Sequence, residues 1–296
     1  YALHAVAIIK LSKRITPFLI VIGVIAVLSL MELCRRSVGL PILCVVGVLL
    51  IYTFATGYAK TPDLFKVLRQ VVYALFYSDS GVMSTPINVC AKYIVVFIIF
   101  GAFLERTGIA NFFIDLANSI AGSSAGGPAK VAVISSALCG MVSGSSVGNT
   151  VTTGSVTIPM MKKTGYKPEF AGAVEAAAST GGQIMPPIMG AAAFLMAEYI
   201  GVSYATVAVK AILPAVLYFT GIYIAVHLEA KKLGLRGIPR DQLPRMRVLV
   251  RKIYLLTPLV VLVWMVSTNV RTMQTSAAIA ILVAIGVGLI NRDDRI

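Results

Sequence analysis

Two short stretches of the chain combine glycine, hydroxyl and amide groups in a way that could bind ions. The first, from Val142 to Ser155, reads Val-Ser-Gly-Ser-Ser-Val-Gly-Asn-Thr-Val-Thr-Thr-Gly-Ser. The second, from Ser179 to Pro187, reads Ser-Thr-Gly-Gly-Gln-Ile-Met-Pro-Pro. Unwound backbone exposes carbonyl oxygens, which together with hydroxyls are hard ligands suited to Na⁺, while half-helix N-termini can face an anionic group. We therefore expect a cation or anion site where the two stretches meet.

Each candidate binding residue lies in one of these two stretches: Ser143, Gly144, Ser145, Ser146, Asn149, Thr150, Ser179, Thr180, Gly181 and Gly182. Gly181 and Gly182 would permit backbone angles that a Cβ penalises. Pro186 and Pro187 would keep the second stretch from closing into helix. The alternative is that small residues only let helices pack closely. Two such stretches so near one another in the chain favour binding.

The sequence contains few residues that could form a metal site, a catalytic site or a nucleotide-binding loop. Cysteines are widely scattered without a CxxC spacing, and the only histidines are His4 and His227, so neither a zinc site nor a nucleophile–histidine pair is favoured. Gly144–Gly148 lacks the Gly-Lys-Ser/Thr ending of a nucleotide-binding loop. Of the acids in apolar stretches (Glu105, Asp115, Glu175 and Glu198), only Glu175 lies deep, four residues before Ser179, as a proton-coupling or structural candidate.

Composition defines the surroundings of these stretches. Of 296 residues, 58% are hydrophobic and 13% charged, and the mean hydropathy is +0.88. A chain this apolar buries its surface in lipid, which excludes an ordinary soluble enzyme. The net charge of +14 is explained by basic loops that remain in the cytoplasm, so nucleic acid is not an expected partner.

The elements that must position the polar stretches are helices. About 20 apolar residues cross a bilayer, and we expect spans at 16–33, 38–58, 88–105, 202–227, 254–267 and 276–290, with an amphipathic helix at 60–77 and a shorter helix at 108–121. Residues 129–162 form two short arms with basic ends around a polar tip, which predicts a re-entrant hairpin. Residues 168–199 predict a broken transmembrane helix. The fold class is therefore an all-α polytopic membrane protein.

The positive-inside rule gives an orientation. The segment 229–252 carries eight basic and two acidic residues, which predicts a cytoplasmic loop: Lys231, Lys232, Arg236, Arg240, Arg245, Arg247, Arg251 and Lys252 against Glu229 and Asp241. Lys162 and Lys163 then lie in the cytoplasm at the open end of the hairpin. Basic clusters flank both ends of the first span, which leaves the orientation of the first three spans open.

The segments Ser136–Pro159 and Phe170–Gly190 closely resemble the large membrane subunit of TRAP (tripartite ATP-independent periplasmic) transporters. Ala191–Glu198 and the segment His227-Leu-Glu-Ala-Lys-Lys-Leu-Gly-Leu-Arg-Gly237 are similar to its fused-permease branch, which pairs with a TAXI-type substrate-binding protein. The resemblance implies a multi-pass protein of a bacterial or archaeal inner membrane, which takes up small organic acids with Na⁺ or H⁺ as the coupling ion and no other cofactor. Its cation site would lie at Ser143–Asn149 and Ser179–Gly182.

The resemblance also divides the chain. Residues 1–85 would be N-terminal scaffold helices, 86–228 half of an elevator-type transport core, 229–252 the cytoplasmic loop and 253–296 two closing spans. Family members carry two inverted repeats, and only one hairpin and one broken helix are found here, so the second-repeat segment is an expected partner beside the binding protein and the lipid bilayer. A truncated, non-transporting scaffold subunit and, less favoured, an intramembrane enzyme are the alternatives.

Overall fold

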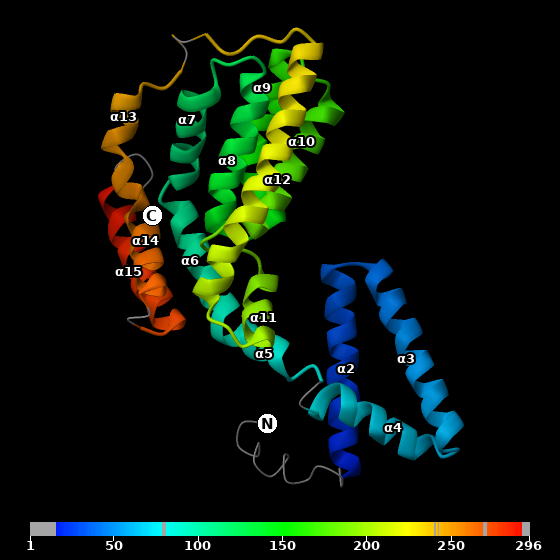
Figure 1. Cartoon of the computed structure of the whole chain (residues 1–296). Coiled ribbons are helices and arrows are strands. Elements are labelled where there is room, and N and C mark those ends of the chain that lie inside the picture. The colour runs from blue at the N-terminus through cyan, green and yellow to red at the C-terminus, as the bar shows by residue number, and fades with distance from the viewer. Residues whose placement is uncertain (1–15, 79–80, 240, 242, 269–270, 292–296) are drawn as a thin grey trace. The chain divides into compact units, whose positions relative to one another are not determined.

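The computed structural model of the chain describes residues 16–78, 81–239, 241, 243–268 and 271–291. Over these ranges the chain forms helices and no strand, which confirms the predicted all-α class. It divides into two compact units, one up to Asn88 and one from Val89 onward, drawn in Figure 1. The expectations that involve His4, the basic residues before position 16, Arg240 and the last residues 292–296 lie outside the described residues.

The first unit contains two long apolar helices and an amphipathic one. Helices α2 (Pro17–Ser37) and α3 (Leu40–Lys60) are joined by a short turn. Gly39 occupies a positive φ of 94° in this turn, a conformation that glycine adopts without strain. Helix α4 (Leu64–Val72) continues into the π-helical turn η1 (Tyr73–Tyr77).

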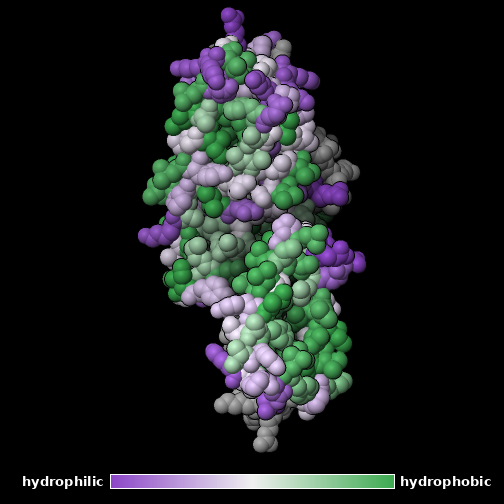
Figure 2. Space-filling model, turned by 90° about the vertical axis from the view of Figure 1, so that its right-hand side faces the viewer, coloured by the Kyte–Doolittle hydropathy of each residue, from purple (hydrophilic) through white to green (hydrophobic). Residues whose placement is uncertain are grey.

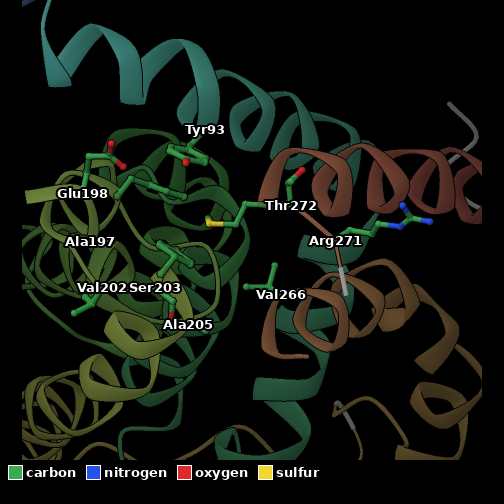
Figure 3. Close-up of a pocket in the computed structure, with 12 residues that line it drawn as sticks. Tyr93, Ala197, Glu198, Val202, Ser203, Ala205, Val266, Arg271 and Thr272 are labelled. Carbon is green, nitrogen blue, oxygen red and sulfur yellow. The ribbon is translucent and has the colours of Figure 1, made fainter. Parts of the chain in front are cut away.

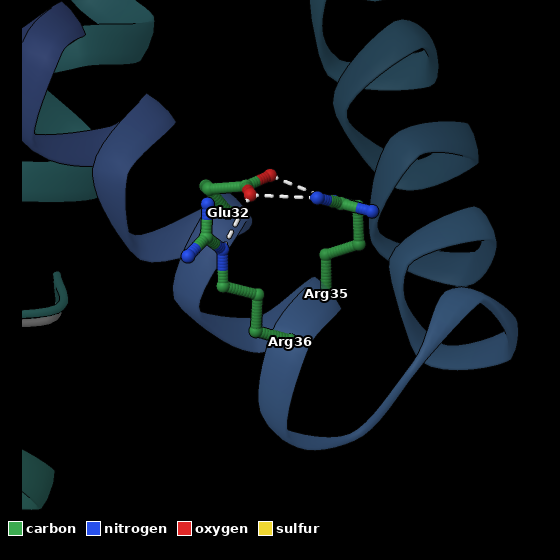
Figure 4. Close-up of polar contacts among 3 residues, drawn as sticks. All are labelled: Glu32, Arg35 and Arg36. Carbon is green, nitrogen blue, oxygen red and sulfur yellow. Dashed lines mark hydrogen bonds and ion pairs between the residues drawn. The ribbon is translucent and has the colours of Figure 1, made fainter.

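Charged residues mark the ends of these helices. Asp63 caps α4 by accepting hydrogen bonds from the backbone N–H groups of Phe65 and Lys66, at 3.1 and 3.3 Å, and its contacts with Lys66 lower the pKa of the Asp63 carboxyl. At the end of α2, Glu32 accepts hydrogen bonds from both Arg35 and Arg36 (Figure 4). Two arginines in a last turn complement the helix dipole.

The boundary between the two units falls within a continuous helical rod, Thr85–Arg106. The rod consists of α5 (Thr85–Val89), the π-helical turn η2 (Cys90–Ile94) and α6 (Val95–Arg106). The helices that follow outside the hairpin and the broken helix are α7 (Ile109–Ala121), α12 (Tyr204–Lys232), α13 (Met246–Arg251), η5 (Ile253–Leu256), α14 (Thr257–Ser267) and α15 (Met273–Ile290). Buried side chains of α6, α7, α14 and α15 form one hydrophobic core, so the expected closing spans belong to this unit.

The predicted hairpin consists of α8 (Gly127–Ser143) and α9 (Ser146–Thr164). The predicted broken helix consists of α10 (Pro168–Gly181), a single 3-10 turn η3 (Gly182–Ile184) and α11 (Ala191–Ile200). Helices α8, α9 and α10 pack on one another, and α12 packs on α8 and α10 (Figure 1). This four-helix packing holds both polar stretches.

Five helices of the described residues are long and apolar enough to cross a membrane: Pro17–Ser37, Leu40–Lys60, Thr85–Arg106, Tyr204–Lys232 and Met273–Ile290. The expected span at 254–267 corresponds to the helical segment Ile253–Ser267, formed by η5 and α14, which is shorter than these five helices. Helix α3 has no buried residue, as expected of a helix that faces lipid. In Figure 2, hydrophobic side chains cover the flanks of both units, whereas hydrophilic ones gather at the end of the second unit where α12 ends.

The segment 229–252 is not simply a loop, which corrects the prediction. Helix α12 continues through its first residues to Lys232, with Glu229 and Lys232 paired at 3.7 Å across one turn, and α13 occupies its end. A pair at this spacing supports helix. The helix ends only where Gly234 takes a positive φ of 65°.

The orientation predicted from charge can be tested by labelling. Lys163 and Arg236 are both exposed, so cysteine placed at either position in a background without the four native cysteines should react with a membrane-impermeant maleimide only in inside-out vesicles. Labelling of intact spheroplasts at either position would reverse the orientation. Cysteine at the exposed Tyr199, near the opposite end of the broken helix, provides the control with the opposite pattern.

Candidate functional site

The tip of the hairpin is only two residues long. Helix α8 ends at Ser143, Gly144 has a positive φ of 60°, and Ser145 caps α9 by accepting a hydrogen bond from the Gly148 N–H at 3.2 Å. The sequence predicts an unwound stretch over 143–153, and this is wrong beyond the tip, because 146–153 form the first turns of α9. Hydroxyls satisfy the helix rather than break it: Thr150 Oγ1 donates to the Ser146 carbonyl at 2.8 Å.

The break in the second helix starts later than the sequence predicts. Helix α10 passes Ser179 and ends at Gly181, and α11 resumes at Ala191 rather than at 188. Between η3 and α11 the chain contains the cis Pro186–Pro187 bond, so the two prolines lie in the break as expected. The Gly190 N–H donates to the Gln183 carbonyl at 2.7 Å, which closes this irregular segment on itself.

The structure brings the hairpin and the break together through glycine contacts. A Cβ on Gly140 would lie 2.3 Å from Cα of Gly182, and one on Gly144 would lie 2.5 Å from the carbonyl oxygen of Met189. Gln183 Nε2 also donates to Ser146 Oγ at 3.1 Å. The backbones of α8, the tip and the break therefore touch directly.

The prediction that Gly181 and Gly182 permit backbone angles penalised by a Cβ is wrong. Both residues have ordinary right-handed helical angles, with φ of −60° and −57°, so neither is needed for an unusual conformation. What requires glycine is space, because a Cβ on Gly181 would lie 2.3 Å from the ring of Tyr218 on α12 and one on Gly182 would lie 2.7 Å from Gly140.

This close approach predicts that alanine has opposite effects on protein stability at two helical glycines. Gly140→Ala should destabilise the protein by about 1–3 kcal/mol, as overpacking of a dense core does. Gly172→Ala on α10 should be neutral or stabilising by about 0.5–1 kcal/mol, because nothing lies within 4 Å of the added Cβ and alanine favours helix. Thermal unfolding of both variants in the same detergent measures the difference. Equal unfolding temperatures would contradict the backbone contact.

Asn149 provides a buried oxygen without a partner. The side chain is 1% exposed, and its Nδ2 donates to the carbonyl oxygen of Ser136 at 2.9 Å. This bond fixes the amide orientation, because the opposite orientation would set two oxygens against each other. Oδ1 then has no hydrogen-bond partner. A buried amide oxygen beside the glycine contact of α8 and η3 is well suited to bind a small cation.

A second polar group lies at the same three-helix interface, around Glu175. This carboxyl is fully buried and accepts hydrogen bonds from four hydroxyls. Oε1 accepts from Ser136 at 2.7 Å, from Ser179 at 3.0 Å and from Thr153, and Oε2 accepts from Thr157. None of the ion pairs found among the described residues includes Glu175. The hydroxyls come from α8, α9 and α10, so the cluster joins the hairpin to the broken helix.

Among the remaining predicted site residues, Ser179 belongs to this cluster. The Thr180 side chain lies outside it, is exposed and donates to its own helix, to the Ala176 carbonyl at 2.8 Å. Ser143 Oγ has only long contacts of 3.4 Å with the backbone of Ser145. Sequence reasoning named Asn149 and Glu175 and missed the residues that surround them, Ser136, Thr153 and Thr157. The four-residue spacing of 149, 153 and 157 on one helix face was the available signal.

Tyr204 is another residue that the sequence analysis did not single out. It lies at the start of α12, is 5% exposed, and its hydroxyl lies 2.8 Å from the Pro187 carbonyl and 2.7 Å from the Ile188 carbonyl. Its ring stacks on Phe194 of α11 at 4.4 Å. The hydroxyl supplies a donor to carbonyls that lost their helix partners at the break.

A cavity of 230 Å³ lies next to Tyr204 and is shown in Figure 3. Glu198 and Arg271 lie on opposite sides of it in this view. None of the predicted binding residues lines this cavity. It is therefore separate from the polar cluster.

An all-helical membrane protein with a hairpin seated on a broken helix defines a class, that of membrane transport proteins whose unwound segments meet near a polar site. A family model described as "Tripartite ATP-independent periplasmic transporter, DctM component" matches residues 11–295, and the chain belongs to this family. The protein is accordingly a multi-pass protein of the bacterial inner membrane.

Named relatives agree with this assignment. The chain is 28% identical over 205 residues to the C4-dicarboxylate TRAP transporter large permease protein DctM of Pseudomonas aeruginosa, which covers 68% of this chain and 47% of the relative. It is 28% identical to the protein of the same name from Vibrio cholerae, over 59% of this chain and 39% of the relative. It is 27% identical to the isethionate TRAP transporter permease protein DctMQ of Oleidesulfovibrio alaskensis, over 49% of this chain and 23% of the relative. These relatives are named as permeases, not as enzymes.

The chain spans about half the length of the first two relatives or less, with 47% and 39% of each covered. The described residues of this chain contain one hairpin and one broken helix.

Proposed function

We propose that this chain forms one half of the transport core of a TRAP large permease, and that Na⁺ bound between the hairpin and the broken helix drives the uptake of a small organic acid. The observation that carries the proposal is the buried, unpartnered Oδ1 of Asn149 beside the contact of Gly140 with Gly182. A cation is the partner that such an oxygen lacks, and oxygen ligands suit a hard monovalent ion.

The chemistry of the ligand favours Na⁺ over H⁺ as the coupling ion. An amide oxygen does not take up a proton in the physiological pH range, whereas it coordinates metal cations readily. The proton-binding group near this site is the carboxyl of Glu175, which already accepts hydrogen bonds from four hydroxyls. We therefore assign Na⁺ binding to the amide oxygen of Asn149 and a structural role to the carboxyl of Glu175.

The proposed substrate is a small anion. The relatives named above are described as permeases for C4-dicarboxylate and isethionate, both of which are organic acids. Helices α9 and α11 begin at the tip and at the break, where helix N-termini favour negative charge. We propose as partners a periplasmic substrate-binding protein, of the TAXI type by sequence resemblance, a small-subunit region and a second-repeat segment that completes the site.

Reconstitution tests this proposal. Liposomes that contain the completed transporter, with its second repeat and its binding protein, should accumulate a labelled organic acid under an inward Na⁺ gradient and not under a proton gradient alone. Liposomes that contain only these 296 residues should show no counterflow, because such sites are built between two repeats.

Three results would contradict the proposal. Accumulation driven by protons without Na⁺ would assign ion coupling to a group other than Asn149, and Glu175 would be the first candidate. Robust counterflow by the chain alone would remove the need for a second repeat. A complete transporter with no uptake under either gradient would favour the alternative of a non-transporting scaffold subunit.

A further inference from the structure

A buried lysine lies at the open end of the hairpin, away from the cation site. Lys130 is in the first turn of α8 and is 4% exposed. Its Nζ donates to Ser124 Oγ at 3.2 Å and lies 5.2 Å from the centre of the Tyr223 ring on α12. An ammonium has three hydrogens to donate, and the hydroxyl accepts one of them.

The charge of Lys130 has no anionic partner among the described residues, since none of their ion pairs includes it. Lys231 on α12 carries the same charge and interacts electrostatically with Lys130, whereas the acidic Glu229 of α12 is paired with Lys232. His227, one turn before Lys231, is also within electrostatic reach of Lys130, and its Nδ1 is buried without a hydrogen-bond partner. A buried charge is stable when it is paired, so this corner of the protein is suited to an anion.

An apolar groove leads away from this charged corner. It has a volume of 360 Å³ and is lined by α8, α12 and Met185 of the break. The Lys130 ammonium lies over the ring of Tyr223, which is one of the residues that line the groove. Thr220 is the one lining residue with an aliphatic hydroxyl. From Val216 to Tyr223 the groove follows α12 for about 10 Å.

We propose that this groove and Lys130 form a binding site for an anionic phospholipid, with an acyl chain along the groove and the phosphate at the ammonium. Lys130 lies at the end of the hairpin that also carries Lys162 and Lys163, which the positive-inside rule places in the cytoplasm. Basic pockets between transmembrane helices on that side bind anionic headgroups. The proposal does not depend on which ion or solute is transported.

Charge complementarity distinguishes a lipid from other occupants of the groove. An apolar helix from another subunit or from further chain would cover the groove but would leave the ammonium unpaired. Free phosphate would pair with the ammonium and leave the groove open. An anionic phospholipid satisfies both parts of the site at once, whereas a zwitterionic one brings its own positive charge to a corner that already holds Lys130 and Lys231.

The test is native mass spectrometry of the purified full chain, after delipidation and incubation with equal amounts of phosphatidylglycerol and phosphatidylethanolamine. We expect one phosphatidylglycerol to remain bound in preference, and excess inorganic phosphate not to displace it. Lys130→Gln should reduce its retention about fivefold, the effect of one basic group at an anionic surface, and Lys130→Arg should restore it. Lys163→Gln, at an exposed position of α9, is the matched control with unchanged retention.

The groove is tested separately by Thr220→Trp, which fills it from the exposed face of α12 and should reduce lipid retention while Lys130 stays in place. Monodisperse elution of each variant checks that it is folded. Equal retention of the two lipids, equal loss in Lys130→Gln and Lys163→Gln, or unchanged retention in Thr220→Trp would each overturn the proposal. So would a polypeptide that remains bound in the groove and excludes lipid.

Discussion

Replacing Glu175 by leucine is expected to destabilise the protein strongly, by about 2–4 kcal/mol, because hydrogen bonds to a charged or buried acceptor contribute more than ordinary ones. Four hydroxyls on three helices share this carboxyl as their acceptor. Without it, the hairpin loses its buried polar attachment to the broken helix, and the exposed contact of Gln183 with Ser146 remains. A large fall in the unfolding temperature in detergent, with loss of uptake, is the expected result.

Two further variants make this prediction specific. Glu175→Gln should retain most of the stability, because Thr157 Oγ1 can accept from the new amide and donate instead to the Thr153 carbonyl, 3.0 Å away. Glu169→Leu, at an exposed position of the same helix, should change the unfolding free energy by only about 0.5 kcal/mol. If Glu175→Leu is no less stable than Glu169→Leu, the cluster does not hold the hairpin in place.

Replacing Asn149 by alanine should raise the Na⁺ concentration for half-maximal uptake by the completed transporter at least about tenfold, the effect of losing roughly 1.4 kcal/mol of binding. The substitution removes the buried Oδ1 and leaves the Ser136 carbonyl without its amide donor. It should change the maximal rate and the expression level less than the Na⁺ dependence. Uptake measured against Na⁺ at constant ionic strength gives both quantities.

Thr180→Ala is the matched control for Asn149→Ala. The sequence groups the two residues, but the structure separates them: the Thr180 hydroxyl is exposed and bonded to its own helix. Its removal should leave the Na⁺ dependence unchanged. An equal loss of apparent Na⁺ affinity in both variants would show that the effect of Asn149→Ala is not specific to its buried Oδ1.

The sequence predicts the helical framework well, because the signals that define it are local. Runs of apolar residues mark the spans, and glycines and prolines mark the break at Pro186–Pro187. The hairpin is predicted from two short arms with basic residues at the same end. The amphipathic helix is predicted by the helical spacing of Leu64, Val67, Leu68, Val71 and Val72. Val67 and Val71 are buried as this spacing requires, although Leu64 is exposed.

Helical structure at the hairpin tip is harder to predict, because it depends on hydrogen bonds that composition does not reveal. Serine and threonine compete with the backbone and disfavour helix interiors, so 143–153 looks unwound. In the structure, Ser145 caps the helix, and the Thr150 hydroxyl donates to the carbonyl one turn earlier. The hydroxyls thereby become part of the helix.

The polar cluster could be predicted only in part. Glu175 stands out in sequence as a deep intramembrane acid, and Asn149 as an amide near the tip. Their partners come from other helices, so their identity depends on how α8, α9 and α10 are rotated about their axes. The glycines show the same dependence, since Gly181 and Gly182 are explained by Tyr218 and Gly140, which lie far away in the chain.

The most direct test of the central claim, that Asn149 binds the coupling Na⁺, is the unfolding temperature of the completed transporter titrated with NaCl against choline chloride at constant ionic strength. A ligand that binds only the folded state stabilises it by about 2.7 kcal/mol at 100 times its Kd. We predict a rise in unfolding temperature with NaCl for the wild type and for Thr180→Ala, and none for Asn149→Ala. An equal rise with choline chloride, or a wild-type response in Asn149→Ala, would contradict the account.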